Sequence, residues 1–129
     1  MTFEWTKLLG FSSNEGSIGY ALTTGADGSI YIAGDTSVGL DGQTFKDRHN
    51  AFISKFNPDG SKEWTKLLGS SYNDYAYATE GTFGYALTAG ADGSIYITGK
   101  NRGGLDGQTW TQGGDAFISK FNPDGSKEW

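Results

Sequence analysis

The stretch AFISKFNPDGSKEW occupies Ala51–Trp64 and recurs unchanged at Ala116–Trp129. Shorter identities flank it: EWTKLLG at Glu4–Gly10 and Glu63–Gly69, ADGSIYI at Ala26–Ile32 and Ala91–Ile97, and GLDGQT at Gly39–Thr44 and Gly104–Thr109. Successive Glu-Trp pairs stand 59 and then 65 positions apart, and the six extra residues form an insertion between Gly69 and Tyr85. Self-similarity over such long periods predicts a repeat architecture, in which each repeat is one supersecondary unit that packs on the next.

Each repeat is predicted to form four antiparallel strands. In the first repeat they lie at Gly19–Gly25, Ser29–Gly34, Ala51–Phe56 and Lys62–Leu68. The motifs ADGS and NPDGS join them as tight turns, because Pro pre-sets φ and Gly accepts a positive φ. β-branched and aromatic residues fill the runs between turns, and no long stretch has helical periodicity. Apolar residues fall on both faces of most strands, so each sheet needs cover on both sides, as radially arranged propeller blades provide.

Three elements together resemble the SBBP repeat, the seven-bladed β-propeller repeat of bacterial proteins. They are the DGSIYIAG and DGSIYITG strands, the AFISKFNPDGS hairpin and the EWTKLLG strand, and the resemblance covers nearly the whole chain. The resemblance implies an all-β propeller whose blades have four antiparallel strands, with two blades in this chain. It implies no catalytic residues, because these repeats define an architecture. Residues 1–10 are interpreted as an orphan outermost strand, residues 11–69 as blade one, and residues 70–129 as blade two lacking most of its outermost strand.

The order of the strands predicts assembly between copies of the chain. The orphan strand at the start is the element that the second blade lacks, so strand exchange around a closed ring would complete every blade. Two blades per chain allow a trimer with six blades or a tetramer with eight, and the tetramer is favoured. The residues assigned to assembly are Trp5, Leu8, Phe117, Ile118 and Trp129. The competing interpretation is an aggregating fragment with open sheet edges. Such similar repeats with abrupt ends are also typical of a designed or truncated chain.

The two repeats differ mainly in the long connections at one end of the predicted blades. These connections suggest an alternative function, a carbohydrate- or protein-binding module, since long loops in compact domains are often functional. The candidate binding residues are Tyr72, Asp74, Tyr75, Tyr77, Glu80, Arg102 and Trp110. Tyr and Trp offer a large contact area with one polar group each. The competing interpretation is that these rings pack back onto the blades and that the loops have simply drifted.

Composition argues against several classes of function. The net charge is −5, which gives no electrostatic basis for binding nucleic acid or an anionic membrane. There is no cysteine, and no stretch has the roughly 20 apolar residues of a membrane span. The first residues, MTFEW, lack the basic start and apolar core of a signal peptide, so the chain as given is expected to be cytoplasmic.

No enzyme, metal site or cofactor is expected from the polar residues. His49 has no evident partners for acid–base chemistry, and Asp41 and Asp106 lack the ligand spacing of a calcium loop. The aspartates of ADGS and NPDGS, which are Asp27, Asp59, Asp92 and Asp124, are interpreted as turn residues. Trp64 is assigned to the packing between blades together with Trp5 and Trp129. Lys55 and Lys120 are expected to lay their stems over a neighbouring blade with their amines in water.

Overall fold

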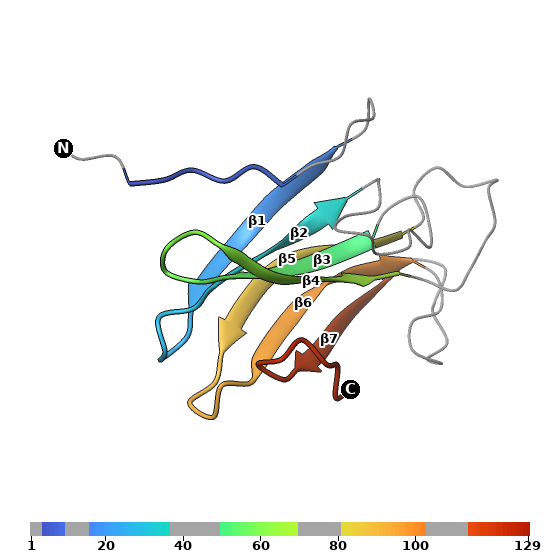
Figure 1. Ribbon diagram of the computed structural model, residues 1–129. Helices are drawn as coiled ribbons and strands as arrows, with labels where there is room; N and C mark the ends of the chain where they lie inside the picture. The colour runs from blue at the N-terminus through green and yellow to red at the C-terminus, as the bar shows by residue number, and fades with distance from the viewer. Residues whose placement is uncertain (1–3, 10–15, 37–49, 70–80, 103–113) are drawn as a thin grey trace.

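All the regular structure in the computed structural model is β-strand, within the residues that it describes: 4–9, 16–36, 50–69, 81–102 and 114–129. β1 (Ser17–Thr24), β2 (Ile30–Thr36), β3 (Asn50–Phe56) and β4 (Lys62–Leu68) form one antiparallel sheet in chain order, here called sheet 1. β5 (Gly81–Ala89), β6 (Ile95–Arg102) and β7 (Asp115–Phe121) form sheet 2 in the same way (Figure 1). The predicted all-β class and the antiparallel order of the strands are confirmed for these residues.

The tight turns between strands form as their residue types predict. The backbone N–H of Gly25 donates to the carbonyl of Ser29 at 2.8 Å, and the N–H of Asn57 donates to the carbonyl of Ser61 at 2.8 Å. Gly60 has a φ of 88°, a conformation that costs other residues free energy. The four turn aspartates each accept a bond from the N–H two residues on, which confirms their role: Asp27, Asp59, Asp92 and Asp124.

The first strand of each sheet carries the same β-bulge. The pairing of β1 with β2 shifts between Gly19 and Ala21, and the pairing of β5 with β6 shifts between Gly84 and Ala86. A bulge leaves one extra residue out of the ladder and bends its strand. The extra residues are Tyr20 and Tyr85, whose rings meet edge to face at 5.3 Å. The two bulged strands therefore approach each other at the same height.

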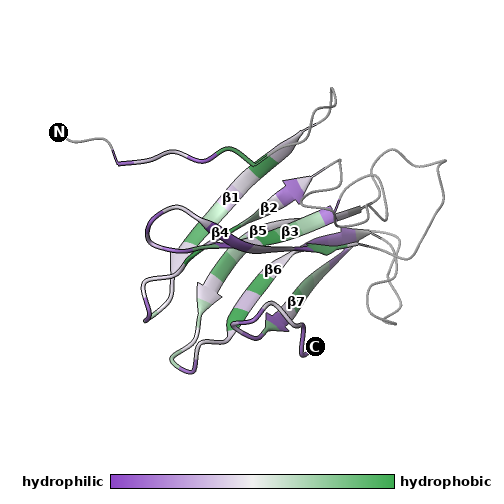
Figure 2. Ribbon diagram, viewed as in Figure 1, coloured by the Kyte–Doolittle hydropathy of each residue, from purple (hydrophilic) through white to green (hydrophobic). Residues whose placement is uncertain are grey.

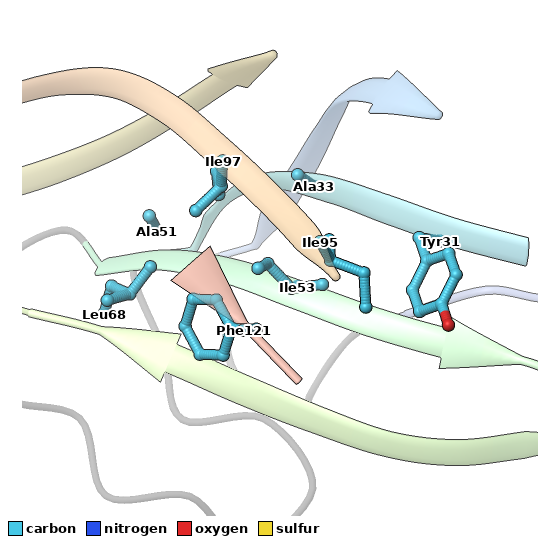
Figure 3. Packing of buried hydrophobic residues seen from close by; sticks show 8 residues of the cluster. All are labelled: Tyr31, Ala33, Ala51, Ile53, Leu68, Ile95, Ile97 and Phe121. Atoms are coloured by element: carbon cyan, nitrogen blue, oxygen red, sulfur yellow. The ribbon is translucent and has the colours of Figure 1, made fainter. Parts of the chain in front are cut away.

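The hydrophobic core lies between the two sheets (Figure 3). Sheet 1 contributes Tyr31, Ala33, Ala51, Ile53 and Leu68, and sheet 2 contributes Ile95, Ile97 and Phe121. Hydrophobic residues occur along the strands of both sheets (Figure 2). Successive residues of a strand point to opposite faces, and the exposed Leu22 and Ile118 lie away from this core. Each fully buried Ile or Phe contributes about 1.5–3 kcal/mol to folding. The contact between the repeats therefore accounts for much of the stability of the chain.

The segment Glu4–Leu9 crosses the other face of sheet 1 without joining a strand. Leu9 packs on the fully buried Phe52 beside Ile32 and Leu67, and its carbonyl accepts a bond of 2.6 Å from the hydroxyl of Ser17. The predicted orphan strand thus lies in an extended position within one chain but has no ladder partner among the described residues.

The residues after the last turn begin a fourth strand in sheet 2. Lys127 forms a bridge with Phe121, the N–H of Glu128 donates to the carbonyl of Lys120 at 2.8 Å, and the N–H of Lys120 donates to the carbonyl of Trp129 at 2.7 Å. These pairings repeat those of β3 with the start of β4. Lys127–Trp129 therefore occupies the position in sheet 2 that Lys62–Trp64 occupies in sheet 1.

Candidate functional site

The contact between the sheets is anchored on one backbone carbonyl, that of Pro123. It accepts hydrogen bonds from Lys55 Nζ and from Trp64 Nε1, each at 3.2 Å. Beside it, Gly125 has a φ of 91°, and a Cβ at this position would lie 3.0 Å from the Trp64 ring and 2.9 Å from Lys66. The last strand of sheet 1 thus closes over the final turn of sheet 2, where only glycine leaves enough room.

Besides its bond to Pro123, Lys55 has charged and aromatic partners within sheet 1. Its Nζ lies 3.1 Å from Glu63 and 5.9 Å from the centre of the Tyr31 ring. Burial alone would lower the pKa of Lys55, but the bond to Glu63 and the nearby negative groups outweigh it, so the pKa rises above its ordinary value of 10.5. The expectation that this amine sits in water is wrong, because a neighbouring sheet covers it. In sheet 2 the same pair recurs as Lys120 and Glu128 at 3.0 Å, with greater exposure.

The first residues of the chain make the same contacts against sheet 1. Trp5 Nε1 donates to the carbonyl of Pro58 at 3.2 Å. A Cβ on Gly60 would lie 2.9 Å from the Trp5 ring and 3.2 Å from Lys7. These residues are the repeat counterparts of those that join β4 to the last turn of sheet 2, which are Trp64, Lys66, Pro123 and Gly125. Glu4–Leu9 therefore lies against sheet 1 as β4 lies against sheet 2.

Trp129 is the third repeat counterpart of Trp5 and Trp64. It makes the contact within its own sheet that Trp64 makes in sheet 1. Its ring centre lies 6.4 Å from that of Tyr96, as Trp64 lies 6.1 Å from Tyr31. Trp64 also reaches the carbonyl of Pro123 in the neighbouring sheet. Trp64 therefore makes both a ring contact in its own sheet and a hydrogen bond to the next. Among the described residues, Trp5 has the hydrogen bond of this pair and Trp129 has the ring contact.

The face of sheet 2 that points away from sheet 1 is apolar and exposed. Ile53 is fully buried in sheet 1, whereas its counterpart Ile118 is 58% exposed, and Trp129 is 55% exposed. Thr98 replaces Ala33 on this face, and its hydroxyl donates to the carbonyl of Phe117 at 2.6 Å. We call this surface the Ile118 face and define it by Tyr96, Ala116, Ile118 and Trp129.

The complementary surface lies on sheet 1, on its side away from sheet 2. Leu87 packs against the core between the sheets, whereas its counterpart Leu22 is 65% exposed. We call this surface the Leu22 face and define it by Ile18, Leu22, Ile30 and Ile32. Its counterparts in sheet 2 include Ile95 and Ile97, which are fully buried against sheet 1. The chain thus presents, on opposite sides, both halves of the interface that it buries internally.

The residues predicted from sequence fall into three groups. Of the residues assigned to assembly, Trp5, Leu8, Ile118 and Trp129 are exposed and Phe117 packs against the core between the sheets. Of the loop candidates, Arg102 is the last residue of β6. The others lie outside the described residues: Tyr72, Asp74, Tyr75, Tyr77, Glu80 and Trp110, as do His49, Asp41 and Asp106.

Sequence reasoning missed the acceptors of the interface. Pro58 and Pro123 were interpreted only as turn residues, although their carbonyls bind a tryptophan from the neighbouring element. No residue type could have revealed them, because NPDGS is accounted for by the turn that it forms and every residue has a backbone carbonyl.

The part of the chain that the structure describes has no group of three or more His, Asp or Glu side chains placed to hold a metal ion. Nor do these residues include a helix long and apolar enough to span a membrane. The charged groups with shifted pKa values belong mainly to turns. For example, the N–H and hydroxyl of Ser29 lower the pKa of Asp27, and the hydroxyl and N–H of Ser61 lower the pKa of Asp59.

The fold and its contacts define an all-β protein made of two packed repeats of one antiparallel sheet. No family model matches the chain. It is similar to a protein of Caulobacter vibrioides named Regulatory protein FlaEY, with 27% identity over 133 aligned positions. The match includes 95% of this chain but spans only 13% of the length of that protein.

Proposed function

We propose that this chain is a non-enzymatic, self-assembling β-propeller scaffold. Sheets 1 and 2 act as two blades, and copies of the chain join by strand exchange into a ring of six blades from a trimer or eight from a tetramer. The observation that carries the proposal is the match between the two outward faces and the buried contact. Ile53 and Leu87 belong to the core between the two sheets of one chain. Their exposed counterparts, Ile118 of one copy and Leu22 of the next, would form the same kind of core between copies.

The same match supports a ring over a simple dimer. The two faces differ from each other, so the contact is head to tail, and a head-to-tail contact repeats until rotation closes it. Closure would cover the Ile118 face and the Leu22 face on every copy. An open chain of copies would leave one of each exposed, which is an aggregation hazard.

The similarity to a short part of a longer regulatory protein is compatible with this role. The match includes both repeats of this chain and 13% of that longer protein. If further repeats follow in one chain, the same two faces meet within it. In either arrangement the interface is the one that the described residues already form once.

The first test is the mass of the protein in solution, measured by light scattering coupled to size exclusion. The expected mass is three or four times the chain mass of 13.8 kDa, with one narrow peak. A monomer at micromolar concentration would contradict self-assembly. A broad, growing distribution would contradict ring closure.

A mixing experiment tests the head-to-tail geometry directly. Leu22→Glu destroys the Leu22 face and Ile118→Glu destroys the Ile118 face, and both side chains are exposed within one chain, so each variant should fold as a monomer. Mixed in equal amounts, they should form a dimer of twice 13.8 kDa and nothing larger, because one intact face of each kind remains. Ala26→Glu, in an exposed turn, is the control that should keep the full ring. Monomers only in the mixture would contradict a head-to-tail interface.

The alternative function, glycan or protein binding, rests on loop residues that, apart from Arg102, lie outside the described part of the chain. It stays a prediction from the sequence, and no contact of the described residues favours it.

A further inference from the structure

We propose that Glu4–Leu9 of one copy becomes the fourth strand of sheet 2 in the next copy, in one fixed register, and displaces Glu128 and Trp129 as it docks. This inference rests on the proposed ring. It adds which strand edge is paired, in which register, and which residues of the neighbouring copy are displaced. Two parts of the chain would pair in this exchange. One is Glu4–Leu9, which has no ladder partner among the described residues, and the other is the outer edge of β7.

Among the described strands, none covers the outer edge of β7 where the fourth strand should continue. On this edge the described chain pairs only near Lys120 and Phe121, through Lys127–Trp129, and no described strand lies beside Ala116–Ser119. An open edge with unpaired backbone groups is a template for a strand from another chain. A segment of matching sequence, Glu4–Leu9, is held beside sheet 1 of every copy.

The register follows from β3 and β4, whose sequences recur in the two partners. In sheet 1, Ser54 stands opposite Thr65 and Ile53 stands opposite Lys66. The hydroxyls of Ser54 and Thr65 bond at 2.7 Å, so these two side chains share one face. By repeat correspondence, Ser119 would face Thr6 of the next copy and Ile118 would face Lys7. In the same register Leu8, which is 93% exposed in one chain, would stand opposite Phe117 as Leu67 stands opposite Phe52.

Only one tryptophan can fill the position between two copies. Trp64 defines that position, because it contacts Tyr31 in its own sheet and the Pro123 carbonyl in the next. In the ring, Trp5 of one copy and Trp129 of its neighbour would both be directed to the equivalent place.

Trp5 has more contacts than Trp129 to hold it in that position. It is bonded to the Pro58 carbonyl and packs over Gly60, and Leu9 farther along the segment packs on Phe52. Among the described residues, Trp129 has contacts with its own sheet, and it is the more exposed of the two. Thr6–Leu9 can pair with the open edge first, and Trp5 and Glu4 then replace Trp129 and Glu128 with like side chains. The exchange costs little, since Glu4 would take the place of Glu128 beside Lys120.

Disulfide trapping tests the register, and the chain has no cysteine of its own. Thr6→Cys with Ser119→Cys, and separately Lys7→Cys with Ile118→Cys, place each thiol pair directly opposite and on one face. Mild oxidation should link most of the protein into covalent multimers on a non-reducing gel, because opposed Cα atoms lie within disulfide reach.

Matched controls use the same four positions in swapped pairs, Thr6→Cys with Ile118→Cys and Lys7→Cys with Ser119→Cys. A shift of one residue places the thiols on opposite faces, so the swapped pairs should not cross-link. Equal trapping of both sets would overturn the register. A ring of unchanged mass with no trapping in either set would overturn the strand exchange and leave the proposed ring standing. A monomer in every variant and in the parent protein would overturn both.

Single substitutions separate the two tryptophans. Trp5→Ala should raise the concentration at which the ring dissociates by about tenfold or more, as expected for an interface aromatic with a hydrogen bond. Trp129→Ala should leave that concentration unchanged or lower it, because the displaced residue no longer competes. The reverse order of effects would overturn the displacement.

Discussion

Lys55 contacts both sheets through one side chain. It reaches Pro123 in the neighbouring sheet and Glu63 in its own. Its sequence position, in the middle of an apolar strand, predicted a stem over a neighbouring sheet. The buried amine could not be predicted, because its acceptor is a backbone carbonyl 68 residues away that carries no sequence signal.

Replacement of this lysine should be costly only where a second sheet covers it. In the monomeric Leu22→Glu background, Lys55→Met should destabilise the chain by about 1.5–3 kcal/mol, the value of a hydrogen bond from a charged group. Lys120→Met is the matched control and should cost clearly less than Lys55→Met, because its ion pair is more exposed. Urea unfolding measures both. Equal costs in the monomer would contradict the special role of Lys55.

Deprotonation of Lys55 should lower the free energy of unfolding at high pH. The pKa of Lys55 in the folded state is raised above 10.5, so its favourable contribution is complete below pH 10.5 and is lost as the pH rises through the raised pKa. Lys55→Met should therefore flatten the fall in stability above pH 10.5, measured by urea unfolding in the Leu22→Glu background. An unchanged slope in the variant would show that another group causes the loss.

At the scale of elements, the turns follow from their residues alone. The structure lowers the pKa of the turn carboxylates through bonds from the backbone and hydroxyl groups of Ser residues, as at Asp92 and Asp124. A lowered folded-state pKa means that these groups stabilise the fold above about their ordinary value of 3.8, and that this contribution is lost as the pH falls through the lowered values.

Substitution of all four turn aspartates by Asn should keep the acceptor oxygen and remove the titration. The residues are Asp27, Asp59, Asp92 and Asp124. The variant should lose less stability than the parent between pH 4 and about pH 2, followed by circular dichroism during thermal unfolding. If the acid limb is unchanged, carboxylates elsewhere in the chain are responsible.

The strand sequence EWTKLLG demonstrates that an element can depend on its neighbour. At Glu63–Gly69 most of it belongs to β4, which pairs with β3. At Glu4–Gly10 the described residues of the same sequence form no strand. Strand propensity mainly reports how well side chains fit a pleated, half-buried surface, and the ladder itself needs a partner edge. The sequence therefore predicted the capacity for a strand, and the available edge decided where one forms.

At the scale of the whole molecule, self-assembly would link stability to concentration. Binding between folded copies stabilises the folded state by mass action, so the Tm of the parent protein should rise with protein concentration. The Tm of the Leu22→Glu variant should not change with concentration. Differential scanning fluorimetry over a hundredfold concentration range measures both. A constant Tm for the parent protein, in the range where the variant is also constant, would contradict assembly in that range.

By itself, the sequence determined the all-β class, the approximate positions of β1–β7, the turns and the correspondence between Trp5, Trp64 and Trp129. Local rules are sufficient there, because turn chemistry and strand propensity act over a few positions. Only the tertiary structure decided which face of each sheet is buried and which is left open. Ile53 and Ile118 lie in identical stretches, yet one is fully buried and the other exposed. The physical reason is that burial depends on which sheet lies opposite, and identical sequences cannot specify different neighbours.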